Sequence, residues 1–401
     1  MSRSTVSDPS DTANRTRPPL NVAMIGIGQT PVGEHWDISL RQLAFQAIQS
    51  AMQDAAVRTV DALVVGNALA GTLSGQQQLG ALVADFAGLR GVEAFRVEAA
   101  DASGGAALRQ GCLLIESGAA ETVLVLGVEK VTDVVGSERT AALAEFTDSE
   151  YESAQGATPV ALAALLMRRY LYENKLTVAD FAGFSVNAHA NGGKNVNAMY
   201  RNAIRADRFA SAPLVADPVN LFDVAPDADG AAAVILSRAD RAVDQVAQPV
   251  RILGSAAATD TLAIHDRADL LFLSAVNLAA GRAFAQAGIT PGAVNVLELH
   301  DSTTILAALA LEASGFAERG SGWRLAAENR IGLNGSLPIS TFGGLKSRGN
   351  PLGATGIYQA VEIALQLRGQ AGPNQVPNAR IGMTQNVGGL GGTAVAHIFS
   401  L

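Results

Sequence analysis

The stretch Val97–Gly111 reads VEAADASGGAALRQG, and the rest of the chain is organised around it. It predicts the end of a strand at Phe95–Glu98, a tight turn of small residues, and a helix over Ser103–Ser117. Glycine and serine allow a ligand to approach the backbone closely, and a helix N-terminus carries free N–H groups and partial positive charge. Asp101 stands just before this helix, where a nucleophile or an anion is stabilised.

Outward from this stretch, the same order of elements occurs twice. The first half predicts strand Val22–Ile27, helix Ser39–Asp54, strand Asp61–Gly66, a helix near Gly75–Gly88, the Asp101 turn with its helix, and strand Thr122–Glu129. The second half predicts strand Val250–Gly254, helix Leu271–Ala287, strand Asn295–Leu299, a helix from Thr304, a glycine-rich turn at Gly343–Gly356, a helix to Arg368, and strands Arg380–Asn386 and Thr393–Phe399. The strands are nearly continuous apolar runs, which indicates burial on both faces. Two βαβαβαββ units of an α/β fold account for this order.

Residues 131–219, between the halves, do not repeat. They predict one strong helix, Pro159–Asn174, and long loops with little periodicity. Loops of this length inside a compact domain are usually functional, so we expect this insertion to cap the site. The predicted organisation is a disordered tail at 1–20, an N-terminal half at 21–245 that includes the insertion, and a C-terminal half at 246–401.

Composition excludes several classes of protein. The chain has 401 residues and a formal net charge of −8, which argues against nucleic acid or an anionic membrane surface as the main partner. Its one cysteine excludes a disulfide framework and a cysteine-based metal site. No apolar run is long enough to span a bilayer. The first twenty residues are polar without an apolar core segment, and a cytoplasmic location is expected.

Six motifs in order resemble the thiolase family, in its sterol-carrier-protein-x and archaeal acetoacetyl-CoA thiolase branch. They are VEAADASGGAALRQG, VLVLGVEKVTD (Val123–Asp133), LFDVAPDADGAAAVIL (Leu221–Leu236), LELHDSTT (Leu297–Thr304), GGLKSRGNPLGATG (Gly343–Gly356) and TQNVGGLGGTAV (Thr384–Val395). The resemblance implies a layered α/β/α/β/α sandwich, a homodimer or tetramer, a role in lipid metabolism, and an acyl-CoA thioester as the ligand with no further cofactor and no metal.

The resemblance also implies which residues form the site, and here the chain departs from the family. Thiolases place an acyl-accepting cysteine where this chain has Asp101, and a GHP histidine where it has Asn350. Their late acid/base loop reads Gln385-Asn386 here, and His300 of the HD motif remains. Six residues are expected to bind the substrate or CoA, namely the four glycines Gly344, Gly353, Gly388 and Gly389 together with Gln385 and Asn386. The sole cysteine, Cys112, lies too far along its helix to replace the missing nucleophile.

Two readings of these residues stay open. In the first, Asp101 and His300 transfer protons while Asn350 and glycine N–H groups hold an oxyanion, so that the protein makes or breaks a C–C bond beside a CoA thioester by a cysteine-independent route such as retro-aldol cleavage. In the second, Asp101 only tolerates the helix N-terminus, His300 packs or caps a helix, and Asn350 is a turn residue. The chain would then be a CoA-binding or scaffold subunit, with an HMG-CoA-synthase-like enzyme and a small zinc-ribbon/OB-fold protein as implied partners.

Overall fold

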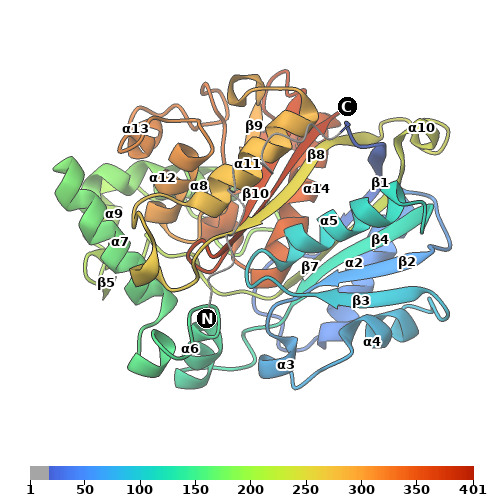
Figure 1. The fold of residues 1–401 in the computed structure, drawn as a ribbon, viewed down its shortest axis with the longest axis horizontal. Coiled ribbons are helices and arrows are strands. Elements are labelled where there is room, and N and C mark those ends of the chain that lie inside the picture. The colour runs from blue at the N-terminus through green and yellow to red at the C-terminus, as the bar shows by residue number, and fades with distance from the viewer. Residues whose placement is uncertain (1–17) are drawn as a thin grey trace, which may run out of the picture.

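The computed structural model describes residues 18–401, and its main feature is a mixed sheet that runs through both halves of the chain (Figure 1). Within the described residues the sheet has nine strands in the order β3-β2-β4-β7-β1-β8-β11-β10-β9. The strands are β1 (Val22–Gln29), β2 (Ala62–Gly66), β3 (Glu93–Val97), β4 (Thr122–Glu129), β7 (Gly230–Arg238), β8 (Val250–Thr259), β9 (Val296–Glu298), β10 (Ile381–Gly388) and β11 (Thr393–Ser400). The expected α/β fold is confirmed.

The strand order shows the internal repeat directly. The first strands of the two halves, β1 and β8, pair antiparallel at the centre of the sheet. Outward from β1 the first half continues with β7, β4 and β2, and outward from β8 the second half continues with β11, β10 and β9. Each half thus places its last strand next to its first, then the strand before the last, and then its second strand. The third strand of the second half is missing, contrary to the expected complete unit. Only a single parallel bridge between Leu297 and Ile339 stands there. Pro338, which has no N–H to give to a ladder, limits pairing at this edge.

Helices cover the sheet in layers. The α-helices are α2 (Leu40–Asp54), α3 (Ala70–Leu73), α4 (Leu79–Phe86), α5 (Ser103–Glu116), α6 (Ser137–Ala144), α7 (Pro159–Asn174), α8 (Ala182–Gly192), α9 (Ala206–Ala210), α10 (Ala239–Ala242), α11 (Ser274–Ala287), α12 (Thr304–Ala313), α13 (Gly322–Ala327) and α14 (Thr355–Leu367). α5 and α14 pack on each other and on strands of both halves, whereas α2 covers the first half and α11 the second. None of these helices combines the length and apolar character that crossing a bilayer requires.

The two central helices approach closely because small residues line their contact. A Cβ atom on Gly104 of α5 would lie 2.7 Å from the carbonyl oxygen of Gly353, just before α14. The turn before α5 and the turn before α14 are therefore held side by side. These turns carry Asp101 and Asn350.

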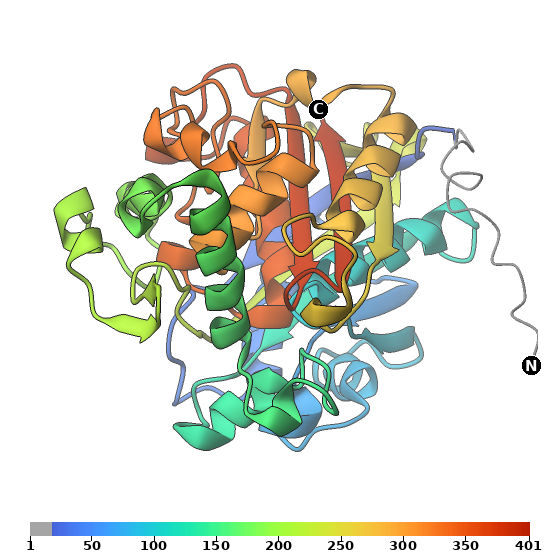
Figure 2. The same ribbon diagram turned by 60° about the vertical axis from the view of Figure 1, so that its left-hand side comes forward.

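The insertion is more helical than expected. α7 is found at its predicted bounds, but α6, α8, α9 and the small hairpin of β5 (Leu214–Ala216) and β6 (Val219–Asn220) were missed. α8 escaped prediction because its buried positions include polar residues, among them Asn187, His189 and Asn191, which hide an apolar period. Figures 1 and 2 show the insertion in green along one side of the molecule.

The predicted disordered tail lies mostly outside the described residues. Of its last three positions, Pro18 and Pro19 are exposed and Leu20 is buried. The carbonyl oxygen of Pro18 accepts a hydrogen bond from Gln286 of α11 at 3.3 Å. Contacts with the folded chain therefore begin before residue 21.

Candidate functional site

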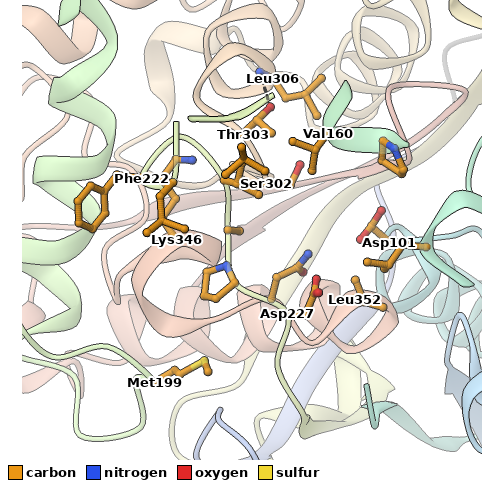
Figure 3. Close-up of a pocket in the computed structure, with 18 of the residues that line it drawn as sticks. Asp101, Val160, Met199, Phe222, Asp227, Ser302, Thr303, Leu306, Lys346 and Leu352 are labelled. Carbon is orange, nitrogen blue, oxygen red and sulfur yellow. Dashed lines mark hydrogen bonds between the residues drawn. The ribbon is translucent and has the colours of Figure 1, made fainter. Parts of the chain in front are cut away.

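A pocket of about 810 Å³ lies where the two halves and the insertion meet. From the first half it is lined by Glu34, Asp101 and the segment 221–227, and from the second half by segments at 302–306, 346–352 and 389–390. The insertion contributes α6, the start of α7, His189 of α8 and residues after α8. Its apolar wall includes Leu143, Phe146, Val160, Phe222, Leu306 and Leu390. Figure 3 shows Asp101 at one end of the pocket and Lys346 toward the other.

Asp101 stands before the N-terminus of α5, and three donors act on its carboxylate. These donors are the Asn350 side chain, the Gly389 N–H and its own N–H, and each lowers the pKa of Asp101. The side chain is almost fully buried. Burial has the larger effect and raises the pKa of Asp101 to about 7, and the negative charge of Asp227 raises it further. A carboxyl group with a pKa near neutrality can both accept and return a proton.

Asn350 is oriented by its neighbours so that its amide N–H₂ faces Asp101. Its Oδ1 accepts a hydrogen bond from Thr355 Oγ1 at 2.9 Å, which leaves the nitrogen for the carboxylate. The Asn350 backbone N–H donates to the Pro226 carbonyl at 2.9 Å. The turn before α14 is thus tied both to Asp101 and to the segment that carries Asp227.

A buried carboxylate, Glu129 at the end of β4, holds the turns beneath the pocket together. Its Oε1 accepts hydrogen bonds from Asn67 Nδ2 (2.8 Å) and Leu69 N (3.0 Å), and its Oε2 from Ala68 N (2.7 Å) and Gly353 N (3.1 Å). Burial raises the pKa of Glu129 to about 7, while the backbone hydrogen bonds lower it. Gly353, predicted as a ligand-binding residue, instead supplies one of these donors and does not line the pocket.

His300 lies behind the pocket wall. Its ring is completely buried, neither ring nitrogen has a hydrogen-bond partner among the described residues, and it is not part of the pocket lining. Burial, together with the positive charge of Arg348, lowers the pKa of His300 to about 3. The imidazole is therefore neutral at physiological pH and has no contact with the pocket through which to transfer a proton.

Gln385 and Asn386 point to opposite faces of β10, as successive residues of a strand do. Gln385 donates to Ser314 Oγ at the end of α12, and Asn386 donates to Gln359 of α14. Neither lines the pocket.

Of the four predicted glycines, Gly389 alone lines the pocket, with φ of +56°. A Cβ atom on Gly389 would lie 2.6 Å from the Phe146 carbonyl oxygen. Gly344 and Gly388 are packed against Asp301 and Ala99 respectively.

Most residues of the pocket wall were not predicted from the sequence, and two charged ones, Lys346 and Asp227, stand inside motifs. Lys346 belongs to the GGLKSRGNPLGATG motif, and Asp227 to LFDVAPDADGAAAVIL, so both stood in stretches already singled out. Asp227 forms an ion pair with Arg139 of α6 at 3.4 Å. Burial raises the pKa of Asp227, whereas Arg139 lowers it. Charged side chains inside apolar motifs are the signal that could have identified them.

Cys112 cannot supply a thiolate to this site. It is buried on α5 in the core between that helix and the sheet. Burial raises the pKa of the Cys112 thiol to about 12. Residues 18–401 also contain no cluster of three or more His, Cys, Asp or Glu side chains that could hold a metal ion.

Comparisons with known proteins agree with this architecture. The family model described as thiolase, N-terminal domain, matches residues 22–240, and that described as thiolase C-terminal domain-like matches residues 256–401. The chain is 45% identical over 382 residues to an acetyl-CoA acetyltransferase of Methanothermobacter thermautotrophicus, covering 95% of this chain and 99% of the relative. It is 28% identical to human sterol carrier protein 2, covering 95% of this chain and 72% of that protein.

A solved structure described as an Ltp2-ChsH2(DUF35) aldolase shares the fold. It superposes with a TM-score of 0.83 at 24% identity, covering 96% of this chain and 98% of that one. Human mitochondrial 3-ketoacyl-CoA thiolase gives a TM-score of 0.73 at 19% identity, over 95% of this chain and 99% of the other.

Proposed function

Because the chain belongs to the thiolase family, we propose that it makes or breaks a C–C bond beside a CoA thioester, with Asp101 as general base and without a covalent acyl-enzyme. The observation that carries the proposal is Asp101 itself. Its carboxylate lines an 810 Å³ pocket, is stabilised by the Asn350 and Gly389 donors, and has its pKa raised by burial to about 7.

Acyl transfer to Asp101 is the less favourable chemistry. An acylated carboxylate is a mixed anhydride, which is more reactive than the thioester from which it forms. Nucleophilic catalysis requires an activated nucleophile that gives a usable intermediate, and the single thiol of the chain is buried on α5. A base needs only to accept a proton at the working pH, and a pKa near 7 suits that role.

The proposed reaction is retro-aldol cleavage of a 3-hydroxyacyl-CoA. Asp101 takes the proton of the C3 hydroxyl group, the C2–C3 bond breaks, and its electron pair forms the enolate of the shortened thioester. C3 becomes the carbonyl carbon of an aldehyde or ketone. The enolate then takes a proton at C2, so that one O–H and one C–C bond are exchanged for a carbonyl π bond and one C–H bond.

The donors around Asp101 support the charge as it moves. In the free protein Asn350 and the Gly389 N–H stabilise the Asp101 carboxylate. When Asp101 accepts a proton its negative charge passes to the enolate oxygen. We infer that the same two donors then serve this oxygen, since fixed donors stabilise charge that develops within their reach.

A second candidate is a CoA-binding or scaffold subunit without catalysis. The feature that favours it is that the Asn350 and Gly389 donors already act on the Asp101 carboxylate, which can occupy the place of a ligand's oxyanion. Its partners would then be another enzyme of acyl-CoA metabolism and a small zinc-ribbon/OB-fold protein. Homodimer or tetramer formation and cytoplasmic location remain parts of this proposal.

The test compares the natural protein with Asp101→Asn on 3-hydroxyhexanoyl-CoA, by following butanal and acetyl-CoA. We expect turnover whose kcat/KM rises with pH through about 7, and a loss of about 10²–10⁴-fold in Asp101→Asn. Asp85→Asn, at an exposed ion pair with Arg90, is the matched control and keeps full activity. Equal activity of Asp101→Asn would contradict the role of the base, and binding without turnover would favour the second candidate.

A further inference from the structure

Lys346 is a buried cation on the wall of the pocket. It lies in a single π-helical turn, Gly344–Arg348, between the second half's glycine pair and the turn that carries Asn350. The residue is only 2% exposed, yet it lines the cavity together with Ser302 and Phe222 (Figure 3). The mechanism proposed above does not use it.

The ammonium group is under-partnered for its position. An ammonium has three donors, and Lys346 Nζ donates to the Asp223 carbonyl oxygen at 2.5 Å. Among the described residues it makes no second hydrogen bond, and no ion pair within 4.0 Å includes it. Within residues 18–401 one other lysine is buried, Lys130, and it differs because it is paired with both Asp133 and Asp229.

The nearest carboxylates are occupied by other donors. Asp301 accepts hydrogen bonds from Leu345 N at 2.8 Å and from Ser340 Oγ at 3.2 Å. Asp223 accepts one from Asn220 N at 2.9 Å and another from Thr304 Oγ1. Both act on Lys346 only through longer-range attraction, which opposes the burial that lowers the pKa of Lys346 to about 8.

A buried charge without a close counter-ion is costly, and lysine is almost never buried unless it is paired. The other cation of the lining, Arg139, already has Asp227 at 3.4 Å. An anion that enters the pocket would therefore find Lys346 as its unpaired partner.

The distance from Lys346 to the reacting end of the pocket is set by one extended segment. Lys346 contacts Asp223, Val224 forms a bridge with Thr303, and Asp227 forms a bridge with Asn350. Asp227 lies four positions after Asp223, so this segment spans at most about 14 Å. The residues between them, Val224, Ala225 and Pro226, present an apolar wall to the pocket.

We propose that Lys346, with Ser302 on the same pocket wall, binds a carboxylate at the far end of the acyl group, so that the substrates are CoA esters of medium-length dicarboxylic acids. Ser302 is placed by its backbone, whose carbonyl accepts from Ala225 N at 2.8 Å, while Thr304 N and Lys346 Nζ share the Asp223 carbonyl. The apolar wall accommodates the chain, and the thioester stands at Asp101. This inference rests on the proposed function and names its substrate class.

The experiment is calorimetric titration of adipoyl-CoA and hexanoyl-CoA, two esters of equal chain length that differ in the terminal carboxylate. The natural protein should bind adipoyl-CoA about tenfold more tightly or better, as expected for a charge-assisted hydrogen bond. Lys346→Met keeps the length of the side chain without its charge and should abolish the preference. Lys194→Met, at an exposed lysine, is the matched control and should retain it.

Each other outcome overturns the inference in a distinguishable way. Equal affinity of the natural protein for the two esters leaves the proposed function standing and removes the carboxylate subsite. Equal weakening of both esters in Lys346→Met assigns the lysine to a phosphate of CoA instead. Binding of neither ester removes the acyl-CoA ligand and the inference together. Because Lys346→Met can impair folding, Ser302→Ala is tested alongside it. An unchanged ratio of the affinities for adipoyl-CoA and hexanoyl-CoA in Ser302→Ala, or in a folded Lys346→Met, contradicts the carboxylate subsite.

Discussion

At the scale of single residues, the environment of Asp101 matters more than its identity. The sequence showed an aspartate before a helix, where it would ordinarily be ionised and stabilised. The structure adds near-complete burial and the nearby charge of Asp227, which together hold its pKa at about 7. Burial and the charge of Asp227 make Asp101 a candidate general base, whereas the sequence alone was equally compatible with an inactive site. Neither feature can be predicted from the spacing of residues in the sequence.

The raised pKa has a consequence for stability. The folded protein binds a proton at Asp101 up to about pH 7, whereas the unfolded chain releases it near 3.9. The unfolded state thus binds fewer protons between these values, and the free energy of unfolding falls as the pH rises from 4 to 7. Asp101→Asn lacks this titration, so its free energy of unfolding relative to that of the natural protein should rise between pH 4 and pH 8, by up to about 4 kcal/mol.

Urea unfolding at pH 4, 6 and 8 measures the effect. The two proteins should be about equally stable at pH 4 and should diverge as the pH rises. The contradicting result is a variant that loses stability relative to the natural protein as the pH rises from 4 to 8. It would show that ionising Asp101 costs the folded protein little.

At the level of helices and strands, the bounds of segments with a clear apolar pattern were predictable from the sequence. The direction in which the side chains of a short segment point was not. α7 and β4 were found at their predicted bounds because their apolar residues follow a clear period or run. Gln385, Asn386 and His300 were chosen by their place in motifs, but side-chain direction in a strand alternates. Only the structure shows which side of β10 faces α12 and which faces α14.

The turns that carry the site depend on Glu129 at the end of β4. Either orientation of a glutamine amide at this position would set its N–H₂ group against two backbone or side-chain donors, since each oxygen of Glu129 accepts two hydrogen bonds. Glu129→Gln should therefore lower the free energy of unfolding at pH 8 by roughly 2–4 kcal/mol, the cost of leaving buried donors unsatisfied.

Chemical denaturation of Glu129→Gln beside Glu121→Gln checks this expectation. Glu121 is exposed and forms an exposed ion pair with Arg241, so its replacement should change stability little. Equal stability of the two variants would show that the turns at 67–69 and 353 do not depend on the buried carboxylate.

At the scale of the whole molecule, the repeat places chemistry where the halves meet. α5 and α14 occupy corresponding places in the two units, and their preceding turns bring Asp101 and Asn350 into contact. The order of elements and the family motifs made this arrangement predictable. The composition of the cavity was not, because the insertion that completes its wall has weak periodicity, and because Lys346 is charged within a buried motif.

Cleavage beside a thioester without a cysteine differs from thiolysis in its dependence on free CoA. Thiolysis consumes a molecule of CoA to release the acyl group, whereas retro-aldol cleavage of a 3-hydroxyacyl-CoA needs none. With purified protein and 3-hydroxyhexanoyl-CoA, we predict that butanal and acetyl-CoA form at equal rates in the absence of free CoA, and that acetoacetyl-CoA with CoA gives no turnover at ordinary enzymatic rates of ~1–10³ per second. Cleavage of acetoacetyl-CoA that requires free CoA, with no release of butanal from the hydroxy ester, would contradict the account.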